Sequence, residues 1–446
     1  MKKVLVIKQA TLNQCQSVIE QNYGFSHFEI RIDALSIYND SDLKQLLSQQ
    51  KQPIILTLRT KEHGGSFSGN YQQQITRLAE LLPDYLDVEE HVGPGFIQKL
   101  KENYPKTKII QSLHLPNTPK LLKIDKSSNA DIFKVITQAQ NSLDALRVMH
   151  FAKANPEAII HAAGEAGMVT RLFAVILQQP LIFINGSKES SLEYMQSIYK
   201  IEQITPATRL LALIGTPITH SLGRFFHNER LSGEAVYVNI PLESKQLPEF
   251  FKLISGLPFS GFSVTMPLKQ DILSFVETDL DAVNTLCNHN GEWQAYNTDG
   301  FGVIAAVGNI EGNVLLIGAG GSAVAVARVL KQKSANFSVL NRTLSKAKII
   351  SENAYDFLNF ADYKHQKFDL IINATPNSAA TLAFISEIIR PYVNSKTKYL
   401  GLDYRTPLEP NLDVQIICPK VLFYEQAAIQ LKLFKSAIAE GSASLV

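Results

Sequence analysis

Lys134 is the residue of the amino-terminal half with the clearest potential for covalent chemistry. It lies in the run Ala130-Asp-Ile-Phe-Lys-Val-Ile-Thr137, where apolar residues flank it on both sides. An amine that loses its water among apolar side chains becomes neutral more readily, and a neutral amine attacks ketones. His114 ends the preceding apolar run, Ile109–His114, where an imidazole can carry a proton. Each residue alone is more often a satisfied or exposed side chain, but together they indicate a nucleophile with a proton carrier beside it.

Charged side chains also interrupt earlier apolar runs of the same half. Glu29 and Arg31 lie two residues apart in the run His27–Asp33, and Arg59 ends the next run. The two-residue period of a β-strand would place Glu29 and Arg31 on one face. Taken alone, Glu29 and Arg31 could be a structural ion pair at a solvated strand end. They are evidence for a functional site only in combination with Lys134.

Eight apolar, β-rich runs must position these side chains. Amphipathic segments with helical spacing separate the runs, as Leu43, Leu46 and Leu47 illustrate. Strands that alternate with helices pair in parallel, so the pattern predicts a compact (β/α)8 TIM barrel with its chemistry at the carboxyl ends of the strands. The predicted strands are 3–8, 27–34, 53–59, 85–90, 108–114, 132–137, 158–163 and 180–184.

The carboxy-terminal half contains a glycine-rich turn in Val314-Leu-Leu-Ile-Gly-Ala-Gly-Gly-Ser-Ala323. An apolar strand precedes this turn and a helix of small residues follows it, so its N–H groups can hold a pyrophosphate. The next strand ends in Asn341-Arg342-Thr343, without the acidic residue that binds an NAD ribose. A guanidinium suits a 2′-phosphate, which predicts NADP, with an ordinary surface arginine as the alternative. The predicted cofactor-binding residues are Gly318, Ala319, Gly320, Gly321, Ser322, Ala323, Asn341, Arg342 and Thr343.

Composition narrows the class of partners. The chain has 446 residues, with 43 Lys and Arg against 41 Asp and Glu, a net charge of +2. Such a balance does not favour nucleic acid and leaves small molecules as the expected partners. No apolar stretch approaches the roughly 18 residues that cross a membrane, and no secretory signal stands out, so a cytoplasmic α/β protein with two to four cores is expected.

Several motifs of the first half resemble type I 3-dehydroquinate dehydratase. They are Glu29–Asp33, Arg59–Gly65, Asp87–Glu89, Ser112–His114, Asp131–Lys134 and Gly164–Arg171. The resemblance implies that Lys134 forms a Schiff base with the ketone of 3-dehydroquinate. His114 would then remove a proton from the adjacent carbon before water leaves, giving 3-dehydroshikimate. Arg171 would bind the substrate carboxylate. The residues that would hold the substrate are Glu29, Arg31, Arg59, Arg171 and Gln196.

Three departures from that family concern the same site. His63 stands where the family usually has a glutamate that supports the catalytic histidine, and Ala163 stands where a methionine is usual. The late substrate-binding lid is not recognisable, so Gln196 is only a guess at its glutamine. A slower dehydratase, or a barrel with impaired catalysis, is compatible with these changes.

Motifs of the second half look like shikimate dehydrogenase. They are Gly261–Lys269, Asp281–Thr285, Tyr296–Gly300, Asn373–Pro376, Asp403–Leu408 and Gln426–Ala428. The likeness implies that Lys269 and Asp299 form a catalytic pair, which places a proton on the oxygen of 3-dehydroshikimate as NADPH delivers hydride. Thr375 would join the cofactor site. The residues that would hold the substrate are Ser221, Thr265, Asn284, Tyr404 and Gln426.

One departure in this half lies in His220-Ser-Leu-Gly-Arg224, where the family has a second serine. We hypothesise that Arg224 compensates at the substrate carboxylate. The resemblances together imply a bifunctional shikimate-pathway enzyme that makes shikimate from 3-dehydroquinate. A catalytically inactive sensor of quinate or shikimate is the rival hypothesis. The predicted domains are a barrel at 1–205, a substrate domain at 206–305, a Rossmann NADP domain at 306–420 and a returning helix at 421–446.

Overall fold

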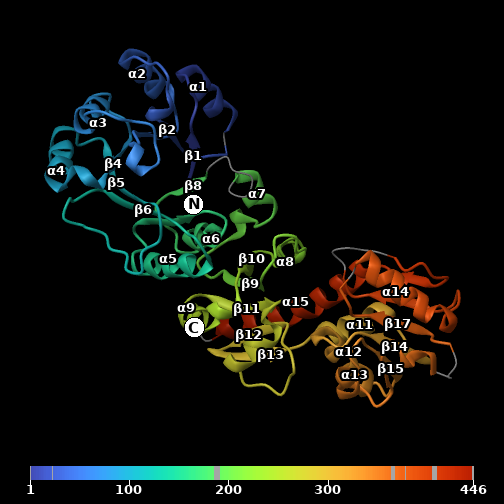
Figure 1. Ribbon diagram of the computed structural model, residues 1–446. Coiled ribbons are helices and arrows are strands. Elements are labelled where there is room, and N and C mark those ends of the chain that lie inside the picture. The colour runs from blue at the N-terminus through green and yellow to red at the C-terminus, as the bar shows by residue number, and fades with distance from the viewer. Residues whose placement is uncertain are drawn as a thin grey trace. The chain divides into compact units, whose positions relative to one another are not determined.

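The computed structural model describes residues 2–22, 24–184, 191–362, 367–376, 378–403 and 409–443. The chain divides into two compact units, each described separately below (Figure 1). The amino-terminal unit holds the residues up to Thr208 with Ser232–Val236 and Glu249–Leu257, and the carboxy-terminal unit holds the rest. None of the described helices has the length and apolarity that crossing a bilayer requires.

Eight parallel strands form the centre of the amino-terminal unit, which confirms the predicted barrel. Their order is β7-β6-β5-β4-β3-β2-β1-β8, so β8 returns to lie beside β1. Every described pairing among them is parallel, and the sheet curves into a near-closed barrel. The strands are β1 (Lys3–Ile7), β2 (His27–Arg31), β3 (Ile54–Thr57), β4 (Tyr85–Glu89), β5 (Lys108–Leu115), β6 (Ile132–Gln138), β7 (Ile159–Ala163) and β8 (Ile182–Ile184).

Helices of this unit begin where a polar side chain can cap them. Thr11 accepts a hydrogen bond from the N–H of Gln14, whose side chain bonds back to Thr11, and Asn39 and Asn70 cap two later helices. The helices are α1 (Leu12–Gln21), α2 (Asp40–Gln49), α3 (Tyr71–Ala79), α4 (Pro94–Asn103), α5 (Ser142–Ala154), α6 (Met168–Ile176) and α7 (Leu192–Ser197).

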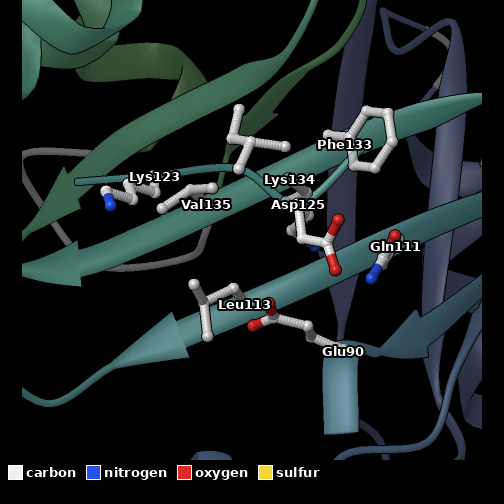
Figure 2. A pocket seen from close by; sticks show the side chains of 9 residues that line it. Glu90, Gln111, Leu113, Lys123, Asp125, Phe133, Lys134 and Val135 are labelled. Carbon is white, nitrogen blue, oxygen red and sulfur yellow. The ribbon is translucent and has the colours of Figure 1, made fainter. Parts of the chain in front are cut away.

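The connection from β5 to β6 departs from the regular alternation of strand and helix that the sequence predicted. Residues 116–131 contain no helix. Pro116 and Pro119 disfavour one, because proline lacks the N–H that an interior helical residue donates. Figure 2 shows Lys123 and Asp125 of this loop beside the outward side chains of β5 and β6.

The carboxy-terminal unit contains two sheets. The first has the order β10-β9-β11-β12-β13, in which β9 and β11 are parallel and β12 pairs antiparallel with both of its neighbours. Its strands are β9 (Arg209–Gly215), β10 (Ala235–Pro241), β11 (Phe259–Val264), β12 (Thr285–His289) and β13 (Glu292–Tyr296). The helices of this stretch of chain are α8 (Gly223–Arg230), α9 (Leu247–Ile254) and α10 (Leu268–Asp271), of which α9 groups from Glu249 on with the amino-terminal unit.

The second sheet has six parallel strands in the order β16-β15-β14-β17-β18-β19. Counted from β14 this is the strand order 3-2-1-4-5-6 of a Rossmann sheet, as predicted. Both faces are buried, since Val314 and Leu316 join one core cluster while Leu315 and Ile317 join another. The elements are β14 (Asn313–Ile317), β15 (Asn336–Leu340), β16 (Ala354–Tyr355), β17 (Leu370–Asn373), β18 (Lys398–Gly401), β19 (Gln415–Ile417), α11 (Asp299–Val307), α12 (Gly321–Gln332), α13 (Leu344–Ile350) and α14 (Ala379–Ile389).

The last helix, α15 (Pro419–Ala443), packs against α11 and against strands β11 and β12 of the first sheet. A glycine permits its approach to α11, because a Cβ at Gly302 would stand 2.8 Å from the Cβ of Gln426. The same helix therefore reaches both the first sheet and the helix that leads into the Rossmann sheet.

Candidate functional site

Lys134 lies on the inner face of β6. Alternation along the strand places Phe133 and Val135 on the outer face (Figure 2). The Nζ of Lys134 donates to Asp87 Oδ2 at 2.9 Å and to Glu29 Oε1 at 3.4 Å, and all three residues are at most 4% exposed. The apolar neighbours seen in the sequence thus face outward, and the amine lies in a buried ion pair rather than alone in apolar surroundings.

Arg59 joins the same group from the end of β3. Its Nη2 donates to Asp87 Oδ1 at 2.8 Å and its Nη1 to Ser112 Oγ at 2.8 Å, with Glu89 Oε1 at 3.4 Å. Burial by itself raises the pKa of Asp87, but Arg59 and Lys134 outweigh burial and hold that pKa well below its usual value. We call this group the barrel cluster. It consists of Glu29, Arg59, Asp87, Glu89, Ser112 and Lys134.

Sequence analysis assigned no role to Asp87, Glu89 or Ser112, although all three are fully buried. A sequence signal for them was available. Polar residues at alternate positions of an otherwise apolar strand lie on one face of it, and a polar inner face suits ligand binding better than core packing.

His114 lies on β5, next to the strand of Lys134. Burial, followed by Arg59 and Lys134, lowers the pKa of His114 well below its ordinary value, so the imidazole is neutral at neutral pH. Its Nδ1 has no hydrogen-bond partner among the described residues. The ring of His63 stacks beside it with centroids 6.5 Å apart. A neutral imidazole in this place can accept a proton.

His161 is a second imidazole of the barrel that sequence reasoning missed. The register aligns His114, Ile136 and His161 on β5, β6 and β7. His161 is 1% exposed, and neither ring nitrogen has a partner in the described part of the chain. Burial, followed by Arg171 and Lys134, lowers the pKa of His161 well below its usual value. The available signal was a lone polar residue in the apolar run of β7.

Arg171 and Arg31 differ in the partners that the protein provides for their guanidinium groups. Arg171, on α6, donates to the carbonyl of Phe183, and no described carboxylate pairs with it. Burial lowers the pKa of Arg171 to about 10, which leaves it cationic. Arg31 instead donates twice to Asp33, at 2.8 Å each. Among the described residues, Arg31 therefore has a carboxylate partner and Arg171 has none.

Gln196 is not brought to the barrel cluster. It is exposed on α7 and donates to Glu202 at 3.0 Å, and Glu202 in turn pairs with Lys3 at the first residue of β1. The amino end of a barrel strand is opposite to the end where chemistry takes place. Residues 185–190, just before α7, lie outside the described residues.

Lys269 and Asp299 meet in the carboxy-terminal unit. The Nζ of Lys269 donates to Asp299 Oδ2, and the Nδ2 of Asn284 donates to Asp299 Oδ1 at 2.7 Å. Asn284 is itself fixed, because its Oδ1 accepts the N–H of Thr298 at 2.9 Å. The side chains of Lys269 and Asp299 are 21% and 16% exposed, so a ligand can reach the pair. The arrangement can pass a proton between the lysine and a bound oxygen.

Gln430 is a further residue that the sequence did not indicate. Its Nε2 donates to the Asn284 carbonyl at 3.0 Å and to Thr285 Oγ1 at 2.7 Å, while its Oε1 accepts from Ser263 Oγ at 3.0 Å. It lies one helical turn after Gln426 on α15, so the two side chains lie on neighbouring positions of the same helix face. That four-residue spacing was the signal that could have found it.

The other predicted substrate residues of this unit are less closely tied to Lys269. Ser221 Oγ accepts the N–H of Gly223 at 3.1 Å near the start of α8, and Thr265 directly follows β11. Gln426 is half-buried against Gly302. Among the described residues, no hydrogen bond joins Ser221, Thr265 or Gln426 to Lys269. Tyr404 lies outside the described residues.

The glycine turn after β14 fits a pyrophosphate. Gly318 has φ of +107°, which favours glycine, and a Cβ on Gly320 would meet no atom within 4 Å. No side chain caps the start of α12, so its first N–H groups are free of side-chain acceptors. Arg342 is exposed after β15, between Asn341 and Thr343, and Thr375 donates to Asn373 after β17. These positions line the carboxyl ends of adjacent strands, where such sheets bind nucleotides.

Known families match both units. Residues 4–206 match the model of type I 3-dehydroquinase, residues 213–286 that of the shikimate dehydrogenase substrate binding domain, and residues 305–407 that of shikimate / quinate 5-dehydrogenase. The chain is 29% identical to the shikimate biosynthesis protein AroDE of Chlamydia pneumoniae, over 81% of this chain and 80% of that protein. It is 31% identical to the chloroplastic bifunctional 3-dehydroquinate dehydratase/shikimate dehydrogenase of Arabidopsis thaliana, over 74% and 62%.

A relative named for the dehydrogenase alone matches part of the chain. The shikimate dehydrogenase (NADP(+)) of Methanococcus maripaludis strain C6 is 33% identical over 46% of this chain and 82% of its own length. The chain therefore belongs to the shikimate dehydrogenase family and carries a type I 3-dehydroquinase domain ahead of the dehydrogenase.

Proposed function

We propose that the chain catalyses two consecutive reactions of the shikimate pathway. The amino-terminal barrel dehydrates 3-dehydroquinate to 3-dehydroshikimate, and the carboxy-terminal unit reduces that product to shikimate with NADPH. The observation that carries the proposal is the presence, in one chain, of a buried amine beside a neutral imidazole and of a separate lysine–aspartate pair. A sensor that only binds its ligand would need neither, and no observation favours that alternative.

In the dehydratase, we assign the nucleophile to Lys134. The neutral amine attacks the ketone carbon of 3-dehydroquinate, and loss of one water leaves an iminium bonded to Nζ. His114 then removes a proton from the adjacent carbon, and the electron pair moves to the iminium nitrogen. The resulting enamine expels the ring hydroxyl, which takes the proton from His114 and leaves as a second water. Hydrolysis of the remaining iminium releases 3-dehydroshikimate and restores the amine.

The charged residues around the amine bind the substrate in this proposal. Arg171 takes the carboxylate, because it is a buried cation without a carboxylate partner in the described part of the protein. Glu29 and Arg59 reach the ring hydroxyls from positions fixed by the barrel cluster, and Arg31 does so from its pair with Asp33. Gln196, which is exposed on α7 and donates to Glu202, is not part of this proposal.

In the dehydrogenase, the cofactor is NADP. The N–H groups of the Gly318–Ala323 turn would hold its pyrophosphate, Asn341, Arg342 and Thr343 would hold its 2′-phosphate, and Thr375 would join the same site. When bound in its reduced form, this cofactor supplies the hydride that reduces the ketone carbon. Lys269 gives a proton to the substrate oxygen, and Asp299 keeps the lysine oriented. Ser221, Thr265, Asn284, Tyr404 and Gln426 are the proposed substrate ligands.

Covalent trapping tests the first activity. Borohydride added with 3-dehydroquinate should reduce the iminium and leave a stable adduct on Lys134, which mass spectrometry of peptides locates. Lys134→Met should abolish the adduct, while Lys123→Met, which removes an exposed lysine on the outer side of the barrel, should retain it. Absence of an adduct on Lys134 in the wild-type chain would refute the Schiff-base mechanism.

Cofactor absorbance tests the second activity in the same preparation. Shikimate with oxidised NADP should give a rising signal that Lys269→Met removes. A flat signal from the wild-type chain would refute the dehydrogenase, whatever the barrel does. The predicted domain limits and a cytoplasmic location stay predictions.

A further inference from the structure

Two histidines and a glutamate converge at the mouth of the barrel. His63 ends the short 3-10 turn Lys61–His63 after β3, Glu89 ends β4, and His91 lies in the next 3-10 turn, Glu90–Val92. The Nδ1 atoms of His63 and His91 stand 3.2 Å and 3.4 Å from the same oxygen, Oε2 of Glu89. One potential ligand atom from each residue lies within 4.8 Å of the other two.

Hydrogen bonding does not explain this convergence. The Nδ1 of His63 is buried and has no hydrogen-bond partner among the described residues, even though Glu89 Oε2 is close. Oε2 already accepts the hydroxyl of Thr60 at 2.7 Å, and Oε1 accepts the N–H of Thr60 at 2.9 Å. The Nδ1 atoms of His63 and His91 therefore both approach Oε2 of Glu89 without forming a hydrogen bond to it. The three atoms are arranged as metal ligands are around a shared cation.

Charge in the neighbourhood also favours a cation. Three buried carboxylates, Glu29, Asp87 and Glu89, face two cations, Arg59 and Lys134, in the barrel cluster. Counted as three carboxylates against two cations, the barrel cluster carries one excess negative charge. A buried charge of this kind is costly unless a counter-ion or hydrogen bonds offset it.

The spacing and the donor types together select the ion. Ligands about 2.0–2.1 Å from a tetrahedral Zn²⁺ stand roughly 3.3 Å from one another, close to both measured separations. Imidazole nitrogens favour zinc and similar transition ions, whereas Mg²⁺ and Ca²⁺ prefer oxygen ligands alone. Three protein ligands leave one position open for water. The hydroxyl and N–H of Thr60 hold Glu89 in place, as outer ligands do in metal sites.

We propose that His63, Glu89 and His91 bind one Zn²⁺ per chain. The ring of His63 stacks beside that of His114, so an ion held there places positive charge near the base of the proposed dehydratase. A bond from His63 to the ion also fixes a ring that stacks on the base of the proposed dehydratase, so we expect bound Zn²⁺ to slow dehydration. Binding itself does not depend on the proposed function, whereas this inhibition does.

Equilibrium dialysis of the full chain against buffered Zn²⁺, followed by metal analysis, tests the site. The wild-type chain should bind one ion per chain, and His63→Gln and His91→Gln should each weaken binding at least tenfold. His289→Gln is the matched control, because it removes an imidazole paired with Glu440 in the other unit and should leave binding unchanged. Thermal unfolding followed by circular dichroism shows that each variant is folded.

Two results would overturn the proposal. The wild-type chain binding no Zn²⁺ is the first, and an equal loss of binding in His289→Gln and His91→Gln is the second. With binding established, added Zn²⁺ should lower the dehydratase rate of the wild-type chain at least threefold and that of His91→Gln by less. Equal inhibition of both would show that the ion does not act from this position. Binding without any dehydratase activity would refute the proposed function and leave the metal site standing.

Discussion

Asp87 is the residue on which the stability of the barrel mouth depends most. Its carboxylate accepts hydrogen bonds from Arg59, Ser112 and Lys134, and it is fully buried. Replacing it with Asn keeps the shape but removes the nearest carboxylate of both Arg59 and Lys134, whose remaining carboxylate partners, Glu89 and Glu29, lie farther away at 3.4 Å. Removing one partner of a buried ion pair costs about 3–5 kcal/mol. That is a large part of the roughly 5–15 kcal/mol by which a domain is stable.

Urea unfolding of Asp87→Asn measures this loss, and the single tryptophan separates the two units. Trp293 lies on β13, so its fluorescence reports on the carboxy-terminal unit, whereas circular dichroism reports on both units. We expect the dichroism transition of the barrel to move to lower urea while the fluorescence transition stays in place. Glu157→Gln is the matched control, because it breaks an exposed pair with Lys126 and should cost under about 1 kcal/mol.

The loss of stability caused by Asp87→Asn should also depend on pH, in a direction that the pKa of Asp87 determines. The pKa of Asp87 is lower in the folded protein than the roughly 3.9 of an unfolded aspartate, so its contribution is fully present above pH of about 4. This contribution to stability decreases as the pH falls from about 4 toward the pKa of Asp87 in the folded protein. The stability difference between the wild-type chain and Asp87→Asn should therefore shrink below pH of about 4. A loss no larger than that of Glu157→Gln at neutral pH would refute the reasoning.

Three other substitutions test separate parts of the two sites. His161→Leu should raise the KM for 3-dehydroquinate about two- to tenfold, since a hydrogen bond to a bound ligand is worth roughly 0.5–1.5 kcal/mol. An unchanged KM in steady-state assays would show that the ring only fills space. Arg342→Ala should lower the ratio of kcat/KM for NADPH to kcat/KM for NADH about tenfold or more. An equal loss of kcat/KM with both cofactors would exclude a contact with the 2′-phosphate. Asp299→Asn should lower kcat for shikimate oxidation by about 10²–10⁴, with an effect on KM alone arguing against a catalytic pair.

The fold was largely predictable because it follows from local periodicity. All eight predicted barrel strands exist, and the predicted Rossmann domain has a parallel sheet of the Rossmann order. Apolar alternation and helical spacing are visible in a single sequence, and parallel pairing follows from their alternation. The segment 116–131 was the exception, because two prolines prevent a helix where spacing alone would allow one.

The composition of each site was also predictable, but its pairing was not. The position of Lys134 in an apolar run showed that it would be buried. Its contact with Glu29 crosses 105 residues of sequence, and the contact between Arg59 and Ser112 crosses 53. Such contacts depend on how far the strands are shifted along one another in the closed barrel, and residue spacing does not reveal that shift. The contacts of Gln430 with the first sheet were hidden for the same reason.

The pairing of Lys134 decides which group must deprotonate it. The amine has to lose a proton before it attacks a ketone, and Asp87 is a poor acceptor because its pKa lies well below its usual value. His114 lies on the adjacent strand, and its Nδ1 has no partner among the described residues, so we expect it to take this proton, to pass it to the water lost as the iminium forms, and then to take the later proton from carbon. His114→Gln should then slow borohydride trapping as well as turnover. Trapping at the wild-type rate with slow turnover would contradict this, and would leave His161 as the neutral imidazole that serves the amine.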